Sequence, residues 1–443
     1  MPETSLKTGT AQPARPRNIR TGLAFLRLTY TETAVAIARR SIPFLLGMAL
    51  YNLGVNYIWI SYNSIILPNQ IQSLFPVQKA LVVGIVVSLS TTAGVVVNIF
   101  SGVLSDNIRL RWGRRWPYIL LGVILTCLGL LVPALLPLAA LTVVLGYLMM
   151  EVFTNLSAGS YQPLLPDIIQ EDQRGQTSGF QGLMTLIGSA MGFGLTGYLV
   201  GIGQVGSALI SMSVAFLLTA LFTIRTIRHS DMFPHEPVSI SIWSAAREIF
   251  RPKTVVISFF WLVLGSFLIF MGSAGLTFFE YYYFETILKI SNPAFAVAIT
   301  GLVILVVAMF SSIIFGYLSD RVGRRNMLIG AALVAGTATL FIPFLTNFYV
   351  FLAVASLVGG PLGIFNSVSY ALASDLAPRE ETGKYMAYSN LAVGGASIVA
   401  AALDGVLLFA FGVSNLEGFV AIFTLSSLLY FVGATVLFKV PRR

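Results

Sequence analysis

Long runs of hydrophobic residues alternate with short polar breaks along most of the chain. Between Ile42 and Phe438 these runs reach the length of about 20 residues that a helix needs to cross a bilayer. A closed β-barrel would instead need alternating segments of about 10 residues, which the stretch 80–104 does not show. The pattern predicts an all-α membrane protein with twelve transmembrane helices, at 42–66, 77–104, 116–136, 138–163, 177–201, 205–225, 254–283, 293–318, 326–345, 347–374, 384–411 and 416–438.

Composition agrees with this pattern. Of the 443 residues, 56% are hydrophobic and 10% are charged, which is too little polar surface to cover a water-soluble protein of this size. Residues 1–41 are basic and lack a small-residue cleavage site, so we do not expect a removed signal peptide. The predicted organisation is a cytoplasmic N-terminal segment (1–41), a six-helix bundle (42–225), a cytoplasmic central loop (226–253), a second six-helix bundle (254–438) and a cytoplasmic C-terminus (439–443).

The basic residues indicate the orientation. On the predicted topology 25 of the 27 Lys and Arg residues fall on one side of the membrane, with Lys79 and Lys289 on the other. Because basic residues accumulate in cytoplasmic loops, we expect both termini and the central loop in the cytoplasm of a multi-pass protein of the cell (plasma or inner) membrane. The net charge of +9 then reflects topology and contact with anionic membrane lipid, and no nucleic-acid partner is expected.

Residues typical of catalysis or metal binding are scarce. Cys127 is the single cysteine, and His229 and His235 both fall in the central loop. No Gly-rich phosphate loop ending in Lys-Ser or Lys-Thr is present, which argues against ATP-driven transport. We therefore expect no enzyme activity, no cofactor and no metal site.

Two loop motifs occur twice. Gly102-Val-Leu-Ser-Asp106 precedes Arg111, Gly113, Arg114 and Arg115, and the pattern returns as Gly316-Tyr-Leu-Ser-Asp320 followed by Gly323, Arg324 and Arg325. A second pair of acids, Asp167 and Asp375, follows the fourth and tenth predicted helices. The chain is thus predicted to contain two related six-helix halves, which in such proteins frame a central site near the middle of the membrane.

The first loop resembles the signature of the major facilitator superfamily, G-x-L-x-D-x-x-x-x-R-x-G-R-R, over its whole length. The resemblance implies a transporter of the major facilitator fold that works by alternating access on a small-molecule substrate. It also implies contacts that form in one access state and break in the other. The gating candidates are Asp106, Arg111, Arg114, Arg115, Asp320, Arg324, Arg325, Asp167 and Asp375. The alternative is that these residues anchor helix ends at the lipid surface.

Ionisable groups inside a membrane are costly and often functional. Glu151 lies near the middle of the predicted span 138–163 without a basic partner in the sequence. Loss of hydration disfavours the charged carboxylate, while access to water on one side would let a proton leave, as proton coupling requires. Asn155 and Gln162 share its helix face and are candidates for a substrate cavity.

A second polar stripe follows the first span. Asn52, Asn56, Trp59 and Asn63 recur at helical spacing. Amides donate and accept hydrogen bonds and an indole can stack on a sugar ring, so the stripe is interpreted as a cavity wall for a hydroxyl-rich ligand. The alternative is that Asn and Gln tie neighbouring helices together.

Two further acids are candidate accessory groups. Asp404 lies in the outer half of the predicted span 384–411, where it could also be a structural acid. Glu280 precedes the tyrosines 281–283, which an aromatic belt at the membrane interface explains. We expect Glu280 to line an outer gate.

Three stretches resemble the sucrose and maltose proton symporters of the glycoside-pentoside-hexuronide cation symporter group. These are Arg111 to Tyr118; the spacing of Glu151, Asn155 and Asp167; and Glu171 to Arg174. The resemblance implies that Glu151 carries the coupled proton and that the substrate is a disaccharide or related glycoside such as sucrose or maltose. Gln162 departs from the plant carriers, which have an arginine there. We expect a monomer.

Several other functions fit the same pattern. A facilitator or sodium-coupled carrier would keep the fold without proton flux. An exporter of amphipathic compounds would have a more apolar cavity and aromatic clusters such as 278–284. A non-transport membrane assembly factor of the same fold would tolerate loss of Glu151.

Overall fold

The computed structural model describes residues 39–107, 113–230, 255–378 and 381–441. The fold set out below is that of residues 40–443, which form one compact unit. Its first half contains α2 (Ile42–Ser61), η1 (Tyr62–Ile66), α3 (Leu67–Leu74), α4 (Lys79–Asn107), α5 (Trp116–Leu135), α6 (Ala140–Tyr161), α7 (Leu164–Ile168), α8 (Glu171–Met191), η2 (Gly192–Thr196), α9 (Gly197–Gly201) and α10 (Val205–Ile227). Its second half contains α12 (Ile257–Thr286), α13 (Pro293–Val322), α14 (Arg324–Phe341), η3 (Ile342–Phe344), α15 (Phe348–Ile364), η4 (Phe365–Ser369), α16 (Tyr370–Leu376), α17 (Thr382–Phe411) and α18 (Leu416–Leu437).

Twelve helical segments in the described ranges are long and apolar enough to cross a membrane, which confirms the predicted fold class. Two boundaries of these segments differ clearly from the predicted ones. The first segment runs on to Leu74 rather than 66, because its polar end packs against the other half of the protein. The fifth begins at Glu171 rather than 177, with two acidic residues in its first turn, where the helix dipole favours negative charge.

The outer surface of the bundle is apolar. Large hydrophobic side chains such as Leu89, Phe222 and Ile313 are at least 60% exposed. Side chains exposed in this way on many helices would be unfavourable in water, whereas lipid tails solvate them. The surface therefore fits a protein whose helices face lipid.

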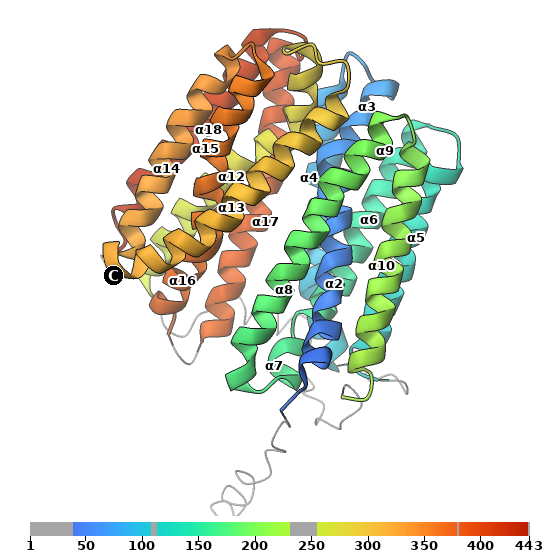
Figure 1. The fold of residues 1–443 in the computed structure, drawn as a ribbon, viewed down its shortest axis with the longest axis vertical. Coiled ribbons are helices and arrows are strands. Elements are labelled where there is room, and N and C mark those ends of the chain that lie inside the picture. The colour runs from blue at the N-terminus through green and yellow to red at the C-terminus, as the bar shows by residue number, and fades with distance from the viewer. Residues whose placement is uncertain (1–38, 108–112, 231–254, 379–380, 442–443) are drawn as a thin grey trace, which may run out of the picture. The chain divides into compact units, whose positions relative to one another are not determined.

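The helices form two bundles, residues 42–227 and 257–437 (Figure 1). In the first bundle α2 packs on α8 and α10, and α6 packs on α4 and α5. In the second, α12 packs on α17 and α18, and α13 packs on α15. The bundles meet where α4 packs on α17 and where η2 and α9 pack on α13.

Glycines allow the helices of the first bundle to approach closely. A Cβ atom at Gly122 on α5 would lie 2.7 Å from the carbonyl oxygen of Phe153 on α6. A Cβ atom at Gly188 on α8 would overlap the carbonyl oxygen of Leu53 on α2 and lie 3.0 Å from its carbonyl carbon. In lipid, helix association depends on such close packing, since no hydrophobic effect drives it.

We expect Gly188→Ala to destabilise the protein by about 1–3 kcal/mol, because the added methyl group must push α8 away from α2. The measurement is thermal unfolding of the purified protein in detergent. Gly179→Ala is the matched control, since Gly179 lies on the same helix and a methyl group added there would have no atom within 4 Å. Equal melting temperatures for the two variants would contradict the close contact of α8 with α2.

Within the described ranges, three membrane-crossing helices contain a π-helical segment. These are η1 between α2 and α3, η2 between α8 and α9, and η4 between α15 and α16. The hydroxyl group of Ser61, the residue directly before η1, lies 2.8 Å from that of Thr196 in η2, so the two helices are joined beside their π segments. Such turns are rare and are often found at functional sites.

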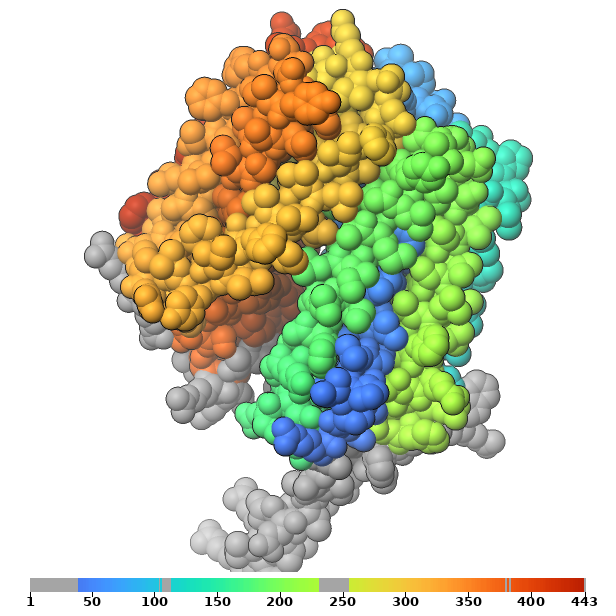
Figure 2. All heavy atoms as spheres, viewed as in Figure 1, coloured from blue at the N-terminus to red at the C-terminus, as the bar shows by residue number. Residues whose placement is uncertain are grey.

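The two ends of the bundle differ. We call the end that carries Arg114, Arg115, Arg324 and Arg325 the basic end, and the opposite end, with the α3–α4 and α12–α13 turns, the closed end. The hydrogen bonds that join described residues of the two halves lie between the middle of the bundle and the closed end. Toward the basic end the two halves diverge (Figure 2).

Candidate functional site

Glu151 lies at the centre of a polar cluster inside the first bundle. Helix α6 places Tyr147 one turn before it and Asn155 one turn after it, so the three side chains share one face. The Tyr147 hydroxyl lies 3.4 Å from Glu151 Oε1, and Asn155 Nδ2 donates a hydrogen bond of 3.2 Å to Oε2. The same hydroxyl donates to Asn63 Oδ1 on η1, at 2.7 Å. Asn63 therefore connects the polar stripe of the first span to Glu151.

The surroundings of Glu151 compensate a negative charge poorly. The residue is 4% exposed, and no Lys or Arg of the described ranges forms an ion pair with it. The single phenolic proton of Tyr147 is directed mainly to Asn63, to which its bond is shorter. One amide donor is then left for a carboxylate that can accept about four hydrogen bonds. Burial without full compensation is costly for an anion and much less so for a neutral acid.

The other predicted cavity residues mostly bind neighbouring helices. Asn52 Nδ2 donates to the Tyr161 hydroxyl at 3.0 Å, and Asn56 Nδ2 donates to Thr185 Oγ1 at 3.3 Å. These amides join α2 to α6 and α8. Trp59 packs, partly buried, against the hydrophobic core, and Gln162 is exposed at the C-terminal end of α6.

A cavity of about 610 Å³ lies between the two halves. Its walls come from α8 and η2 in the first half and from α12, α13, α15 and η4 in the second, with Ile60 of α2. The six residues predicted for the substrate cavity are not among its lining residues, although Asn56 holds the lining residue Thr185. The polar lining residues are Thr185, Ser189, Thr277, Glu280, Ser312 and Asn366, and the rest of the wall is apolar or glycine.

Sequence patterns did not point to most of these polar groups. Thr185 and Ser189 are one turn apart, as are Thr277 and Glu280, so helical spacing between polar residues was a usable signal. Asn366 lies inside η4. Its orientation depends on a π-helical turn that hydrophobic periodicity does not reveal.

The two accessory acids lie in different environments. Glu280 lines the cavity and also a recess of about 90 Å³ inside the second bundle. Asp404, on α17, is buried against Gly275 of α12, where a Cβ atom would overlap its Oδ2 atom. Asp404 is not among the lining residues of either space.

At the basic end of the first half, two arginines of the loop after α4 form ion pairs with the acid Asp167 that follows α6. Arg115 Nη2 lies 2.8 Å from Asp167 Oδ2, and Arg114 Nη1 lies 3.4 Å from the same atom. Arg115 is nearly fully buried. Arg111 lies outside the described residues, as does the side chain of Asp106.

The repeated motif in the second half has a similar arrangement. Gly323 ends α13 with φ 94°, a conformation that favours glycine, and the chain turns so that Arg324 begins α14. Arg324 then pairs with Asp320 at 3.1 Å and with Asp375 at 2.5 Å. Arg325 is buried and donates from Nη1 to the carbonyl oxygen of Val440 at 2.9 Å. These contacts join helix ends within one half.

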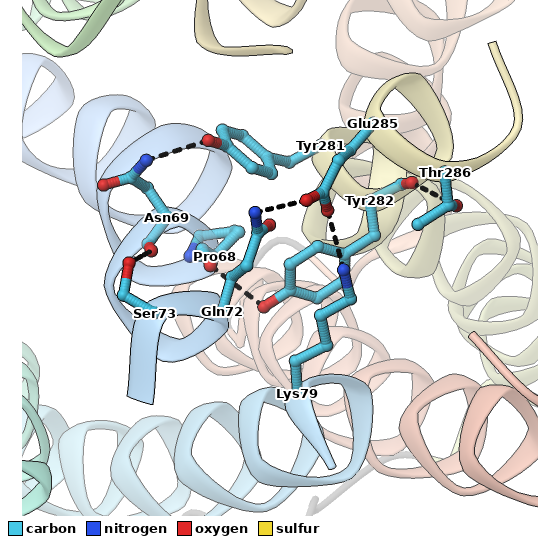
Figure 3. A network of polar contacts seen from close by, with 9 residues as sticks. All are labelled: Pro68, Asn69, Gln72, Ser73, Lys79, Tyr281, Tyr282, Glu285 and Thr286. Atoms are coloured by element: carbon cyan, nitrogen blue, oxygen red, sulfur yellow. Dashed lines mark hydrogen bonds and ion pairs between the residues drawn. The ribbon is translucent and has the colours of Figure 1, made fainter. Parts of the chain in front are cut away.

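An ion pair joins the two halves at the closed end, where residues of α3 and the start of α4 meet the end of α12 (Figure 3). Lys79 Nζ lies 2.6 Å from Glu285 Oε2 and 4.7 Å from the centre of the Tyr282 ring. Gln72 donates from Nε2 to the other oxygen of Glu285. Lys79 is 5% exposed, so its charge is compensated almost entirely by these groups.

Two tyrosines extend this contact. The Tyr282 hydroxyl donates to the carbonyl oxygen of Pro68 at 3.0 Å, and Asn69 Nδ2 donates to the Tyr281 hydroxyl at 2.8 Å. The signal for this arrangement in the sequence is weak, namely a lysine and a glutamate at an end with few charges. We call the following residues the closed-end cluster: Pro68, Asn69, Gln72, Lys79, Tyr281, Tyr282 and Glu285.

Comparison with solved structures identifies the fold. A peptide transporter, POT, crystallised with sulfate, superimposes with a TM-score of 0.71 at 14% identity, over 91% of this chain and 96% of that one. A bacterial homologue of the human lysosomal transporter Spinster, solved in an inward-facing and unoccupied conformation, gives a TM-score of 0.71 at 16% identity, over 91% and 99%. No curated protein matches this chain.

The model of one protein family also matches the sequence. The Major Facilitator Superfamily model matches residues 42–314, which include the whole first bundle, and residues 262–443, which include the second bundle from within α12 onward. Together these matches span the whole membrane part of the chain, residues 42–437. The chain therefore belongs to the Major Facilitator Superfamily, and its fold is that of a membrane transporter that works by alternating access.

Proposed function

We propose that the protein is a secondary active transporter that moves a sugar or glycoside together with a proton, with Glu151 as the proton carrier. The observation behind this proposal is the environment of Glu151, which is buried, bound by Tyr147 and Asn155, and without an ion pair in the described ranges. A carboxyl group in these surroundings can accept a proton from one side of the membrane and release it when water reaches it from the other.

For orientation, we propose that the basic end faces the cytoplasm of the cell or inner membrane, with both termini on that side. The support is the concentration of arginine at that end, because basic residues are retained on the cytoplasmic side. Under this orientation the bundle described above is closed to the outside.

The transport cycle then needs two sets of contacts that alternate. We propose that the closed-end cluster separates when the protein opens outward, while the loop motifs of the basic end come together. The gating residues at the basic end would be Asp106, Arg111, Arg114, Arg115 and Asp167 in the first half, and Asp320, Arg324, Arg325 and Asp375 in the second. Differential contact in the two states is what any gate requires.

Two observations support a sugar or glycoside as substrate. The spacing of Glu151, Asn155 and Asp167 resembles that of the sucrose and maltose proton symporters. The cavity also has hydroxyl and amide groups that can bind sugar hydroxyls. Asn56 contributes indirectly by holding Thr185 at the wall. We propose direct substrate contact for Asn52, Trp59, Asn63, Asn155 and Gln162 in other states of the cycle.

The test is substrate-driven proton movement in proteoliposomes. Sucrose, maltose and a panel of glycosides are added in turn, and the external pH is recorded. Alkalinisation that a protonophore abolishes, and that protein-free liposomes lack, would support proton symport. Uptake of labelled sugar without any pH change would reject proton coupling in favour of facilitated or sodium-coupled transport, which a dependence on added sodium separates.

A second candidate is the export of amphipathic compounds. The observation that favours it is the predominance of apolar residues in the wall of the cavity, including Ile60, Leu186, Phe193 and Met309. A disaccharide exposes hydroxyl groups on all sides and gains little from such a wall, whereas a ligand with an apolar part is stabilised by it.

A further inference from the structure

An acid stands at the boundary between the cavity and the recess. Glu280, on α12, lines both spaces. Its carboxyl group forms no hydrogen bond or ion pair with any residue of the described ranges. Glu285, on the same helix, is by contrast bound to Lys79 and Gln72. Glu280 is thus an acid that faces the space of the substrate and lacks a compensating charge in the described part of the protein.

The recess contains a second polar group without a partner. Thr300, on α13, is fully buried, and its Oγ1 atom makes no hydrogen bond with the part of the chain that the structure describes. It lines the same recess as Glu280. A buried polar atom without a partner is destabilising, so a ligand that supplies the missing hydrogen bond would be stabilised here.

The remainder of the recess is mainly apolar and partly aromatic. Its wall includes Leu276, Val358, Phe351 and Phe423. Its volume of about 90 Å³ admits only a small group, whereas the adjoining cavity of about 610 Å³ can hold the larger part of a ligand. The two spaces share Glu280, so one molecule could occupy both.

The chemistry of the wall selects among ligand classes. An anion would be repelled by an ionised Glu280 and finds no basic side chain among the lining residues. A neutral sugar would bind the neutral acid without a charge-assisted contact and would place hydroxyl groups against the apolar carbon of the recess. A metal ion needs about six oxygen ligands, which a mainly apolar wall does not offer. An organic ammonium ion fits both the polar and the apolar groups of the wall. Its N–H groups donate to carboxylate and hydroxyl oxygens, and its substituents pack against aromatic and aliphatic carbon.

We propose that Glu280, Thr300 and the apolar recess form a binding site for the protonated amine of an amphipathic substrate. The ammonium group lies against Glu280, a short apolar part enters the recess, and the rest of the molecule occupies the cavity between the halves. This inference rests on the proposed transport function and specifies the substrate class of its second candidate.

The test compares two probes that differ in charge and little in shape, 4-phenylbutylamine and 4-phenylbutanol. Binding to the purified full-length protein in lipid nanodiscs is measured by calorimetry near neutral pH, where the amine is protonated. We expect the amine to bind at least about tenfold more tightly than the alcohol, because a charge-assisted hydrogen bond adds about 1.5–3 kcal/mol. Equal affinities, or no binding of the amine, would overturn the proposal.

Variants locate the site. In Glu280→Gln the preference for the amine should vanish, and in Glu280→Asp, which keeps the charge, it should persist. Asp404→Asn is the matched control, since it neutralises another buried acid of the second bundle that is not among the lining residues of either space. If the preference for the amine survives in Glu280→Gln but is lost in Asp404→Asn, the ammonium group binds at Asp404, and the proposed site at Glu280 is wrong. Melting curves of each variant verify that it is folded.

The experiments can reject this inference and the proposed function independently of each other. Sugar-driven proton uptake in wild type, together with no binding of the amine, would reject the ammonium site and leave proton-coupled sugar transport intact. Tight binding of the amine that depends on Glu280, without proton movement for any substrate, would support the site and reject proton coupling.

Discussion

Replacing Glu151 with Gln should abolish proton-driven accumulation of substrate while preserving its exchange across the membrane. Glutamine has nearly the same size as the protonated acid and can still bind Tyr147 and Asn155, but it cannot take up or release a proton. A pH difference of one unit stores about 1.4 kcal/mol per proton, which supports about tenfold accumulation. We therefore expect the variant to stop at equal concentrations on both sides, measured as labelled substrate in proteoliposomes with an imposed pH gradient.

Counterflow separates loss of coupling from loss of folding. Vesicles preloaded with unlabelled substrate should still exchange it for labelled substrate in Glu151→Gln, because exchange needs alternating access without net proton movement. Glu417→Gln is the matched control, since Glu417 is exposed at the start of α18. Accumulation in Glu151→Gln equal to that of Glu417→Gln would show that another group carries the proton.

Breaking the ion pair of the closed-end cluster should shift the protein toward a conformation that is open at that end. Lys79→Gln leaves Glu285 without its cation and removes the contact of the ammonium group with Tyr282. Because Glu285 is partly exposed to solvent, we expect an effect of about 1–2 kcal/mol, below the value for a fully buried pair. The ratio of the two conformations should change about 5- to 30-fold.

Distances between spin labels measure this shift. Val77 and Ser291 are exposed at the closed end, one in each half, and can be replaced by cysteine after Cys127→Ser removes the native thiol. Lys289→Gln removes a charge at the same end without breaking a described contact and is the control. The longer distance should gain population in Lys79→Gln alone. Restoration of the short distance by the exchanged pair Lys79→Glu with Glu285→Lys would assign the effect to the ion pair, and identical distributions in Lys79→Gln and Lys289→Gln would exclude it.

The helices of this protein could be predicted from hydrophobic runs because lipid and protein interior are both apolar. The same rule failed at the end of the first span, which was predicted to stop at 66 and continues to Leu74. Asn69 and Gln72 are polar because they meet Tyr281 and Glu285 of the other half. A hydrophobicity pattern records the polarity of a residue and not the partner that accommodates it.

The candidate site could be predicted only in part for a similar reason. Helical spacing placed Asn155 beside Glu151, and the structure places its amide 3.2 Å from the carboxyl group. Tyr147 has the same spacing on the other side and was missed, since an aromatic residue in a membrane helix is usually interpreted as packing. Periodicity tells which residues share a face, whereas the neighbour of that face depends on contacts between helices distant in sequence. Asn52 and Asn56 illustrate this, with partners on α6 and α8.

The π-helical turn η1 has a consequence for what insertions and deletions this chain can tolerate. A π turn holds one residue more than an α turn, so everything after it is rotated by about 100° relative to the same residues wound as a regular α-helix. Before η1 the helix presents its amides to α6 and α8, and after it Asn69 and Gln72 face α12. Deleting a single residue between 62 and 66 would restore regular winding and leave Asn69 and Gln72 facing the second bundle, because four α-helical residues rotate the chain about as far as five π-helical ones. Inserting a residue there in α winding would instead turn Asn69 and Gln72 by about 100°, away from α12, so this stretch is expected to tolerate a deletion better than an insertion.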